Sequence, residues 1–434
     1  MTASQTIVWL IYPDSIQEVN GNLFNVFLLL HNVMGENYQT PLDFLPEAMV
    51  DDMINQYSTT VFPAVNSYLK HLKEVKMEIR DILEEKKLLK SSGEILEYRG
   101  IDPTVCGVDG AYAISRQIAV DVLGIAAVAV EGLPPYEKRL WKQPHHISKI
   151  VPVEHKADTP TTAGGLMFSY ELELATKAPH NVVLIDGSLT THLIKIGMAF
   201  SKLDSEEVPY SLNNEFKERT KETLDNYRKI ITSPKGDQVF AGLPKYSSRD
   251  EVITLLSEEH KGEFDVLLGK YNDKALLSVI MRSEEIVGPL PLMKRQEEGR
   301  WHISGKKKIK EILGDTTAER YYHDIISALN DLYVIYYKPS SSQPALRVEI
   351  PKSVAKNRAR LAMVIKALQD QAKFPGIIEP YPLYLADLFV KYLGGALSQV
   401  KDIVLSDLTT LDMDADPISV LLSMHEYRSV GGYD

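Results

Sequence analysis

The chain contains a single cysteine, Cys106, in 434 residues. One cysteine excludes an internal disulfide and any zinc site built from several cysteines, and it fits a reducing compartment. Cys106 stands in an apolar run, where a cysteine is typical of a small buried side chain and not of a nucleophile. The sequence therefore predicts a cytoplasmic protein that does no cysteine chemistry.

Positive charge is also scarce. The 48 Lys and Arg residues stand against 59 Asp and Glu residues, which gives a formal net charge of −11. A protein that held nucleic acid through a broad basic surface would show the opposite balance. A nucleic acid would have to be held by a local site, by metal ions or through a partner. The basic run GKKKIK at 305–310 is by itself typical of a solvated face.

A long hydrophobic run is missing as well. The longest apolar stretch near the N-terminus, at 23–30, is too short to cross a bilayer and lacks the basic start of a signal peptide. We therefore expect no membrane partner. The remaining composition, 44% hydrophobic and 25% charged, is that of a globular protein.

The patterns along the chain predict two regions. Residues 1–100 are mostly helical in pattern, and at 64–90 apolar residues recur every three or four positions between Lys and Glu. This amphipathic helix would either pack on the body of the protein or form a dimer contact. Residues 101–434 mix strand and helix patterns, which predicts an α/β domain with a mixed sheet flanked by helices.

Within the second region the apolar runs and turn residues predict particular elements. Residues 205–330 are interpreted as helices alternating with polar loops. The others, in chain order, are two or three strands at 104–132, a loop at 133–149, a helix at about 165–178, a strand at about 181–186, a strand pair at 332–339 and 345–351, and a helix after 379–393.

Two apolar runs end in Asp-Gly, at Asp109 and at Asp186, so both carboxylates are expected at strand ends. Each Asp-Gly alone is typical of a turn. The helical pattern between them places Glu171 on the apolar stripe, whereas Glu173 would face solvent and pair with Lys177. A buried carboxylate needs a positive partner, and no Lys or Arg shares that stripe, which favours a metal ion.

Asp109, Glu171 and Asp186 are therefore the candidate metal ligands. Carboxylate oxygens suit hard divalent cations such as Mn²⁺ and Mg²⁺. Two such ions about 3.5–4 Å apart can activate a water molecule and stabilise the leaving oxygen of a phosphodiester. The sequence thus favours a site with two ions.

These motifs and their order resemble the NurA nuclease family, whose core is an RNase H-like fold. The resemblance covers about residues 100–395. It is carried by VDGAYA, the inward helical Glu171, VVLIDGSL, YNDKALLSVIM at 271–281, VIYYKP with LRVEIP, and PYPLYLAD at 380–387.

The resemblance implies degradation of DNA that depends on Mn²⁺, 5′ to 3′ from duplex ends and endonucleolytic on single strands. It also implies a homodimer that works with a HerA-type hexameric ATPase in DNA end processing or defence. By position, the metal ligands of such a nuclease would be Asp109, Glu171 and Asp186 here.

The chain departs from the family pattern in two motifs. Ala111 stands where the first motif commonly has Ser, and the C-terminal motif, with its Gly-Tyr-Pro and His, is replaced by residues that include Glu379 and Asp387. Asp387 falls on an apolar helix face, so it is either a further catalytic carboxylate or a capping or ion-paired residue. The group that assists proton transfer is left open. His425 is either that group or a surface residue.

Three cationic side chains are candidate phosphate contacts: Lys245, Lys274 and Arg347. Each could instead be a surface or structural residue, and Arg347 could pair with a neighbouring carboxylate.

Two alternative functions stay open. The altered C-terminal motif is consistent with a catalytically altered adaptor subunit of a DNA translocase. An actin-like ATPase would also place Asp-Gly turns at strand ends to hold Mg²⁺ and phosphates. Its Gly-rich adenosine segment would have to be YLGGAL at 392–397.

Overall fold

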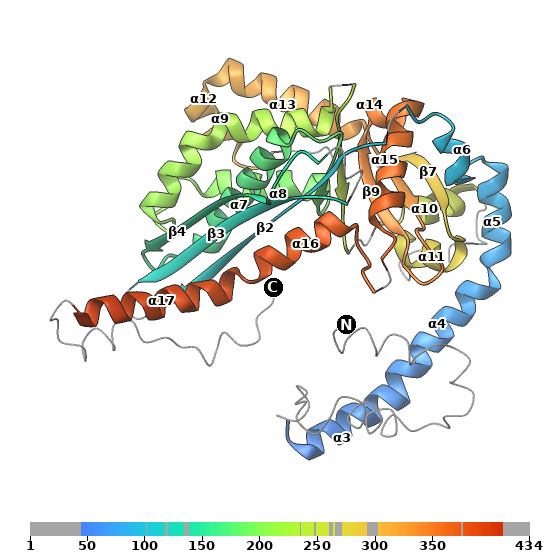
Figure 1. The fold of residues 1–434 in the computed structure, drawn as a ribbon, viewed down its shortest axis with the longest axis horizontal. Coiled ribbons are helices and arrows are strands. Elements are labelled where there is room, and N and C mark those ends of the chain that lie inside the picture. The colour runs from blue at the N-terminus through green and yellow to red at the C-terminus, as the bar shows by residue number, and fades with distance from the viewer. Residues whose placement is uncertain are drawn as a thin grey trace. The chain divides into compact units, whose positions relative to one another are not determined.

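The computed structural model describes residues 45–410, except 101, 118–119, 134–138, 235, 247–248, 260–263, 265–270, 293–302 and 375. The apolar stretch at 23–30 and His425 therefore lie outside the described residues. The chain divides into two compact units, Met1–Asp81 and Ile82–Asp434, whose ribbons are drawn in Figure 1. The domain boundary at residue 100 stays a prediction.

The described part of the first unit is helical, as the sequence predicts. It contains α3 (Glu47–Gln56), a π-helical turn η3 (Tyr57–Val61), α4 (Phe62–Glu74) and the start of α5 (Lys76–Glu85). The helix predicted at 64–90 is thus divided at Val75. It also ends early, because strand β1 (Leu89–Ser91) and the short helix α6 (Ser92–Leu96) follow.

The second unit is built on one mixed sheet of nine strands in the order β1-β7-β8-β9-β6-β5-β2-β3-β4. The strands that follow β1 are β2 (Val105–Arg116), β3 (Asp121–Glu131), β4 (His145–Val153), β5 (Val182–Asp186), β6 (Val239–Leu243), β7 (Glu285–Pro291), β8 (Leu332–Tyr337) and β9 (Leu346–Pro351).

Five neighbouring strands form the RNase H-like core that the sequence resemblance implies. Strand β3 runs antiparallel to both of its neighbours, β2 and β4, and β5 and β6 continue the sheet parallel to β2. Parallel neighbours place their carboxyl ends at the same edge, so residues that follow β5 and β6 lie close to the middle of β2. This arrangement positions the candidate site.

Helices cover both faces of this core (Figure 1). On one face α7 packs against β2 and β3, with α8 and α9 packed against α7; on the other, α16 and α17 pack against β2 and β3, and α15 against β5 and β6. The remaining helices surround these layers. The helices of the unit are α7 (Thr159–Lys177), α8 (Leu189–Lys202), α9 (Tyr210–Thr232), α10 (Glu251–Glu259), α11 (Asp273–Ile280), α12 (Lys306–Leu313), α13 (Asp315–Asn330), α14 (Lys352–Ala355), α15 (Arg358–Gln371), α16 (Tyr381–Lys391) and α17 (Leu393–Thr410).

Most expected elements are confirmed, but several strands differ from the prediction. The predicted strands within 104–132 are β2 and β3, and the late strand pair is β8 and β9. The predicted loop at 133–149 runs into β4, an edge strand whose side chains are mostly exposed or half-buried and so carry little apolar signal. Strands β6 and β7 were also missed, inside a segment that was interpreted as helices and loops.

Two smaller expectations are also confirmed. Cys106 is completely buried, and burial raises the pKa of its thiol. The basic run forms the start of α12, where Lys308 and Lys310 pair with nearby carboxylates at the surface. None of the described helices combines the length and the apolar character needed to cross a lipid bilayer.

Candidate metal centre

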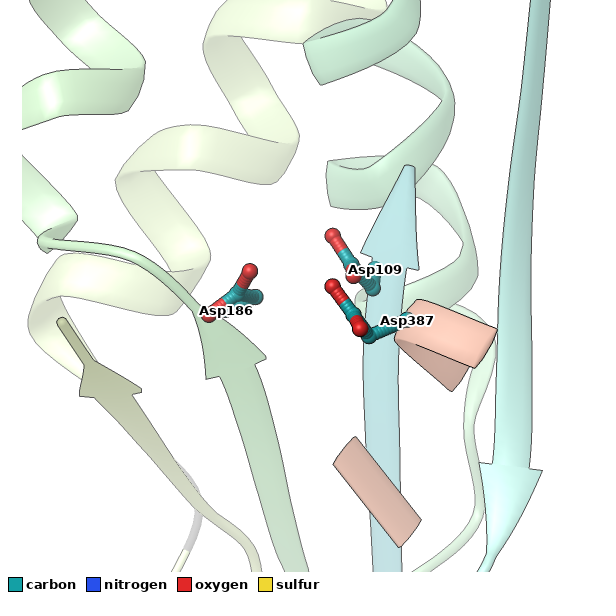
Figure 2. Close-up of side chains that lie close together, drawn as sticks. All are labelled: Asp109, Asp186 and Asp387. Carbon is teal, nitrogen blue, oxygen red and sulfur yellow. The ribbon is translucent and has the colours of Figure 1, made fainter. Parts of the chain in front are cut away.

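Asp109 and Asp186 lie side by side on neighbouring strands. The last paired residues of β2 and β5 are Val108 and Ile185, so the two aspartates come next in the same parallel register. Side chains alternate between the faces of a sheet, and residues in register share a face. Both carboxylates therefore point to the same side of the sheet (Figure 2).

The two Asp-Gly motifs differ in local structure. Asp186 ends β5, and Gly187 has a φ of +82°, a left-handed conformation that favours glycine and makes a turn here. Asp109 instead lies inside β2, which continues to Arg116 against β3. The expectation that Asp109 ends its strand is therefore wrong: only its pairing with β5 ends there.

Helix α16 brings a third carboxylate to this face. A Cβ at Gly107 would lie 2.5 Å from backbone atoms of Pro382 and Leu383, so only glycine lets the start of α16 lie directly on β2. Asp387 follows one turn later. One carboxylate oxygen from each of Asp109, Asp186 and Asp387 lies within 4.8 Å of the others, as Figure 2 shows.

Glu171 approaches the same place from the opposite face. It is buried, as predicted, and a Cβ at Gly110 would lie 2.7 Å from its Oε1 oxygen. The positive partner that the sequence did not reveal is His192, whose Nε2 lies 2.9 Å from Oε2 of Glu171. The structure thus places Glu171 close enough to Asp109 and Asp186 to interact with their charges, with one of its own oxygens already bonded.

Both ring nitrogens of His192 are hydrogen-bonded. Its other ring nitrogen, Nδ1, lies 3.0 Å from the backbone carbonyl oxygen of Ser188. A carbonyl oxygen only accepts hydrogen bonds, so Nδ1 donates to it, and toward an ionised Glu171 Nε2 donates as well. Burial alone would lower the pKa of His192, but the hydrogen bond and charge of Glu171 outweigh burial and raise it.

Glu173 differs from its prediction. It does pair with Lys177, but it also accepts an ion pair from Arg219 of α9, and the residue is 91% buried, so it does not face solvent. The helix stripe predicted the direction of Glu171 correctly, whereas α9 covers the side of α7 that was expected to be free.

Asp109 is a buried carboxylate whose negative charge is not balanced by an ion pair with any described residue. Burial raises its pKa to about 9, and the negative charges of Asp186 and Glu171 add to the effect. Among the described residues no cationic group forms an ion pair with Asp109 within 4.0 Å. Without a cation this carboxyl group therefore holds a proton at neutral pH.

Lys245, which follows β6, and Lys274 of α11 both lie close to these carboxylates. The ammonium of Lys245 pairs with Asp186, Glu379 and Asp387, and that of Lys274 donates to the carbonyl oxygen of Lys245 at 2.7 Å. Their role as phosphate contacts stays a prediction. The structure gives Lys245 a second role, as a partner of the acidic residues.

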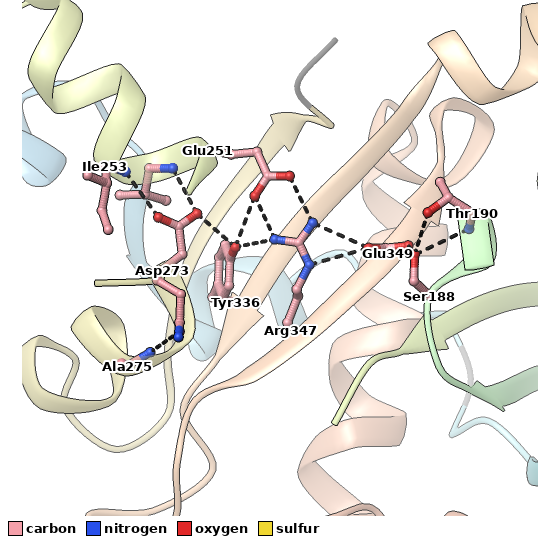
Figure 3. Close-up of polar contacts among 11 residues, drawn as sticks. Ser188, Thr190, Glu251, Ile253, Asp273, Ala275, Tyr336, Arg347 and Glu349 are labelled. Atoms are coloured by element: carbon pink, nitrogen blue, oxygen red, sulfur yellow. Dashed lines mark hydrogen bonds and ion pairs between the residues drawn. The ribbon is translucent and has the colours of Figure 1, made fainter. Parts of the chain in front are cut away.

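Arg347 does not contact a substrate, because its side chain is fully buried. It pairs with Glu251 of α10 at 2.6 Å and with Glu349 at 3.3 Å, so the ion-pair alternative holds. Figure 3 shows this network, in which Tyr336 also links Arg347 to Asp273.

The Arg347 network supports the turn that follows Asp186. The Oε2 oxygen of Glu349 accepts hydrogen bonds from the Ser188 hydroxyl at 2.7 Å and the Leu189 backbone N–H at 3.1 Å (Figure 3). Ser188 in turn caps α8 through the Thr190 N–H. Arg347 therefore affects the site indirectly: it positions Glu349, which stabilises the loop that follows Asp186.

Glu379 is a further acidic residue that sequence reasoning noted only as a departure from a motif. Its Oε2 oxygen is buried and has no hydrogen-bond partner, although Lys245 lies 3.4 Å away. Burial raises its pKa. A buried acceptor without a hydrogen bond is costly unless an ion or a ligand meets it.

The residues fit a hard divalent cation. Carboxylate oxygens are the ligands that Mg²⁺ and Mn²⁺ prefer, and oxygens on opposite sides of one Mg²⁺ ion are about 4.2 Å apart. The spacing among Asp109, Asp186 and Asp387 is of this size. Asp109, with which no described cation forms an ion pair within 4.0 Å, supplies negative charge that such an ion requires.

An RNase H-like sheet with acidic side chains where β2 and β5 separate defines a nuclease-like fold. The chain has a NurA-like fold: it is similar to the crystal structure of the NurA nuclease from Sulfolobus solfataricus, with a TM-score of 0.52 and 14% identity, over 85% of this chain and 99% of that one. No protein-family model matches the sequence, and no curated protein matches it.

The chain is also similar, with lower TM-scores, to two further solved structures. A structure of NurA with manganese has a TM-score of 0.42 and 11% identity, and covers 80% of this chain and 99% of that chain. Endonuclease V from Ciona intestinalis has a TM-score of 0.28 and 16% identity, over 77% of this chain and 99% of that chain.

Proposed function

We propose that this chain is a metal-dependent deoxyribonuclease that hydrolyses phosphodiester bonds. The observation that carries the proposal is the meeting of Asp109, Asp186 and Asp387 at the centre of an RNase H-like sheet. The NurA-like fold supports the same class of activity.

Asp109, Asp186 and Asp387 would hold Mn²⁺ or Mg²⁺. The bound ion would act as a Lewis acid toward the phosphodiester and lower the pKa of a water molecule. Glu171 remains a candidate ligand through Oε1, since Oε2 is bonded to His192. His192 fixes the position of Glu171, and no protein nucleophile is required.

The finer activity that we propose is 5′ to 3′ exonuclease action on duplex ends and endonuclease action on single strands. The proposed assembly is a homodimer that receives DNA from a HerA-type hexameric ATPase in DNA end processing or defence. These features rest on the order of the sequence motifs. The net charge of −11 agrees with them, because a DNA-feeding partner removes the need for a broad basic surface.

A cleavage assay with purified protein tests the proposal. We expect the wild-type chain to degrade 5′- and 3′-labelled duplex DNA with Mn²⁺ and to lose this activity in excess EDTA. The two labels report polarity, and circular single-stranded DNA, which has no ends, reports endonuclease action. Binding of Mn²⁺ without cleavage of any substrate, with and without a cognate ATPase, would favour the adaptor function.

A further inference from the structure

The Lys245 side chain contacts three carboxylates at once. Its Nζ atom lies 2.6 Å from Oδ1 of Asp387, 3.2 Å from Oδ2 of Asp186 and 3.4 Å from Oε2 of Glu379. These partners come from α16, from the end of β5 and from the segment before α16. An ordinary surface ion pair joins one lysine to one carboxylate, whereas this ammonium group lies among several, as a metal ion would.

The surroundings keep Lys245 charged and in place. Three carboxylate oxygens lie within 3.4 Å of its ammonium group, and only 24% of the side chain is exposed. The backbone of Lys245 is held by the Lys274 ammonium, which donates to its carbonyl oxygen at 2.7 Å. The positive charge is therefore a fixed part of the site.

Charge balance limits how many divalent ions the site can take. With every group ionised, five carboxylates face three cations, which leaves two negative charges, the charge of one divalent ion; of these three cations only Lys245 forms ion pairs with more than one of the carboxylates, so only Lys245 occupies a place that a second ion could take. Lys274, one contact further out, reduces the remainder. A second divalent ion would add positive charge beside an ammonium group with no carboxylate left to offset it. The carboxylates are Asp109, Glu171, Asp186, Glu379 and Asp387, and the cations are His192, Lys245 and Lys391.

The uncompensated charge lies on one side of the site. Asp186 and Asp387 share Lys245, whereas Asp109 forms no ion pair within 4.0 Å with any described cation. A single divalent ion bound by Asp109, together with the free oxygens of its neighbours, would leave the ammonium of Lys245 where it is. The site thus separates into a metal position near Asp109 and an ammonium position near Glu379.

We propose that Lys245 is the permanent second cation of this centre, in the place that a second divalent ion would otherwise take, so that the chain binds one divalent ion. This inference rests on the proposed function, because it takes the carboxylate cluster to be a metal site. It replaces the two-ion expectation from the sequence. Lys245 is then a positioning residue that holds Asp186 and Asp387 for the single ion.

The number of Mn²⁺ ions bound per chain tests this role. We expect calorimetric titration to give one ion for the wild type and two for Lys245→Met, because the substitution removes the ammonium and leaves its carboxylates. Electron paramagnetic resonance gives a second readout. Two Mn²⁺ ions about 3.5–4 Å apart are magnetically coupled and lose the six-line spectrum of an isolated ion.

Two variants serve as controls. Lys391→Met removes a lysine that lies 2.5 Å from Asp387 but is 63% exposed and contacts that carboxylate alone, so one ion is expected. Lys245→Arg keeps the positive charge and should also bind one ion. Two ions in Lys391→Met or in Lys245→Arg would show that loss of the Lys245 charge is not what admits the second ion.

The outcomes separate this inference from the proposed function. Two ions in the wild type, or one ion in Lys245→Met, would overturn the role of Lys245 and leave the metal site intact. No Mn²⁺ binding in the wild type would contradict the metal site itself. A count of two ions in the wild type would overturn the role of Lys245 even if Lys245→Met fails to fold.

Discussion

Asp186→Asn should lower Mn²⁺-dependent DNA cleavage by about 1,000-fold or more while the fold is retained. A metal ion stabilises a phosphoryl-transfer transition state by several kcal/mol, and a loss of about 4 kcal/mol corresponds to about 1,000-fold in rate. Asn still accepts the Gly187 N–H bond that Asp186 receives at 2.9 Å, so the turn should persist. Single-turnover rates and thermal melting measure the two effects.

Asp331→Asn is the matched control for this experiment. Asp331 also pairs with a lysine, Lys352 at 3.0 Å, but it is exposed. Cleavage by this variant should equal that of the wild type. An Asp186→Asn protein that kept cleavage within about tenfold of the wild type would contradict the assignment of Asp186, since a tenfold change amounts to only about 1.4 kcal/mol.

Arg347→Met should lower the free energy of unfolding by about 3–5 kcal/mol. This is the usual cost of removing one partner from a buried ion pair, because the remaining charge is left without compensation. Here two carboxylates, Glu251 and Glu349, would lose the guanidinium that they share. The free energy is measured by urea unfolding at neutral pH.

Lys352→Met provides the control for Arg347. Lys352 also bonds a carboxylate, but at an exposed site, where an ion pair contributes about 0–1 kcal/mol. Adding Glu251→Gln to Arg347→Met should recover part of the loss, because one of the two stranded charges is removed. A loss of less than about 1 kcal/mol in Arg347→Met would show that the network is not a structural support.

The strands that carry the site could be predicted because they are buried. The first half of β2, up to Val108, and β5, up to Ile185, are buried and almost entirely apolar, which is the pattern of strands covered on both faces. Strand β4 lies at the edge of the sheet and alternates exposed and half-buried side chains, so its sequence resembles a loop. The pattern within a segment reports its burial, but not its neighbours.

The members of the site could be predicted only in part, because contacts between distant segments leave no local pattern. The helical stripe placed Glu171 inward, but its partner does not lie on the same helix, because His192 comes from α8. Asp387 accepts a hydrogen bond from Lys245, which lies 142 positions earlier in the chain. That contact depends on α16 crossing β2 at Gly107, which no periodicity reveals.

Anomalous diffraction at the manganese edge, from crystals soaked in Mn²⁺, tests most directly whether the carboxylates hold a metal. The account predicts a peak about 2.0–2.4 Å from oxygens of Asp109, Asp186 and Asp387, the distance typical of small divalent cations and oxygen. The side chain of Asp109 should then lie in contact with the ion, deprotonated. Peaks that occur only elsewhere, in crystals of a protein that cleaves DNA with Mn²⁺, would contradict the account.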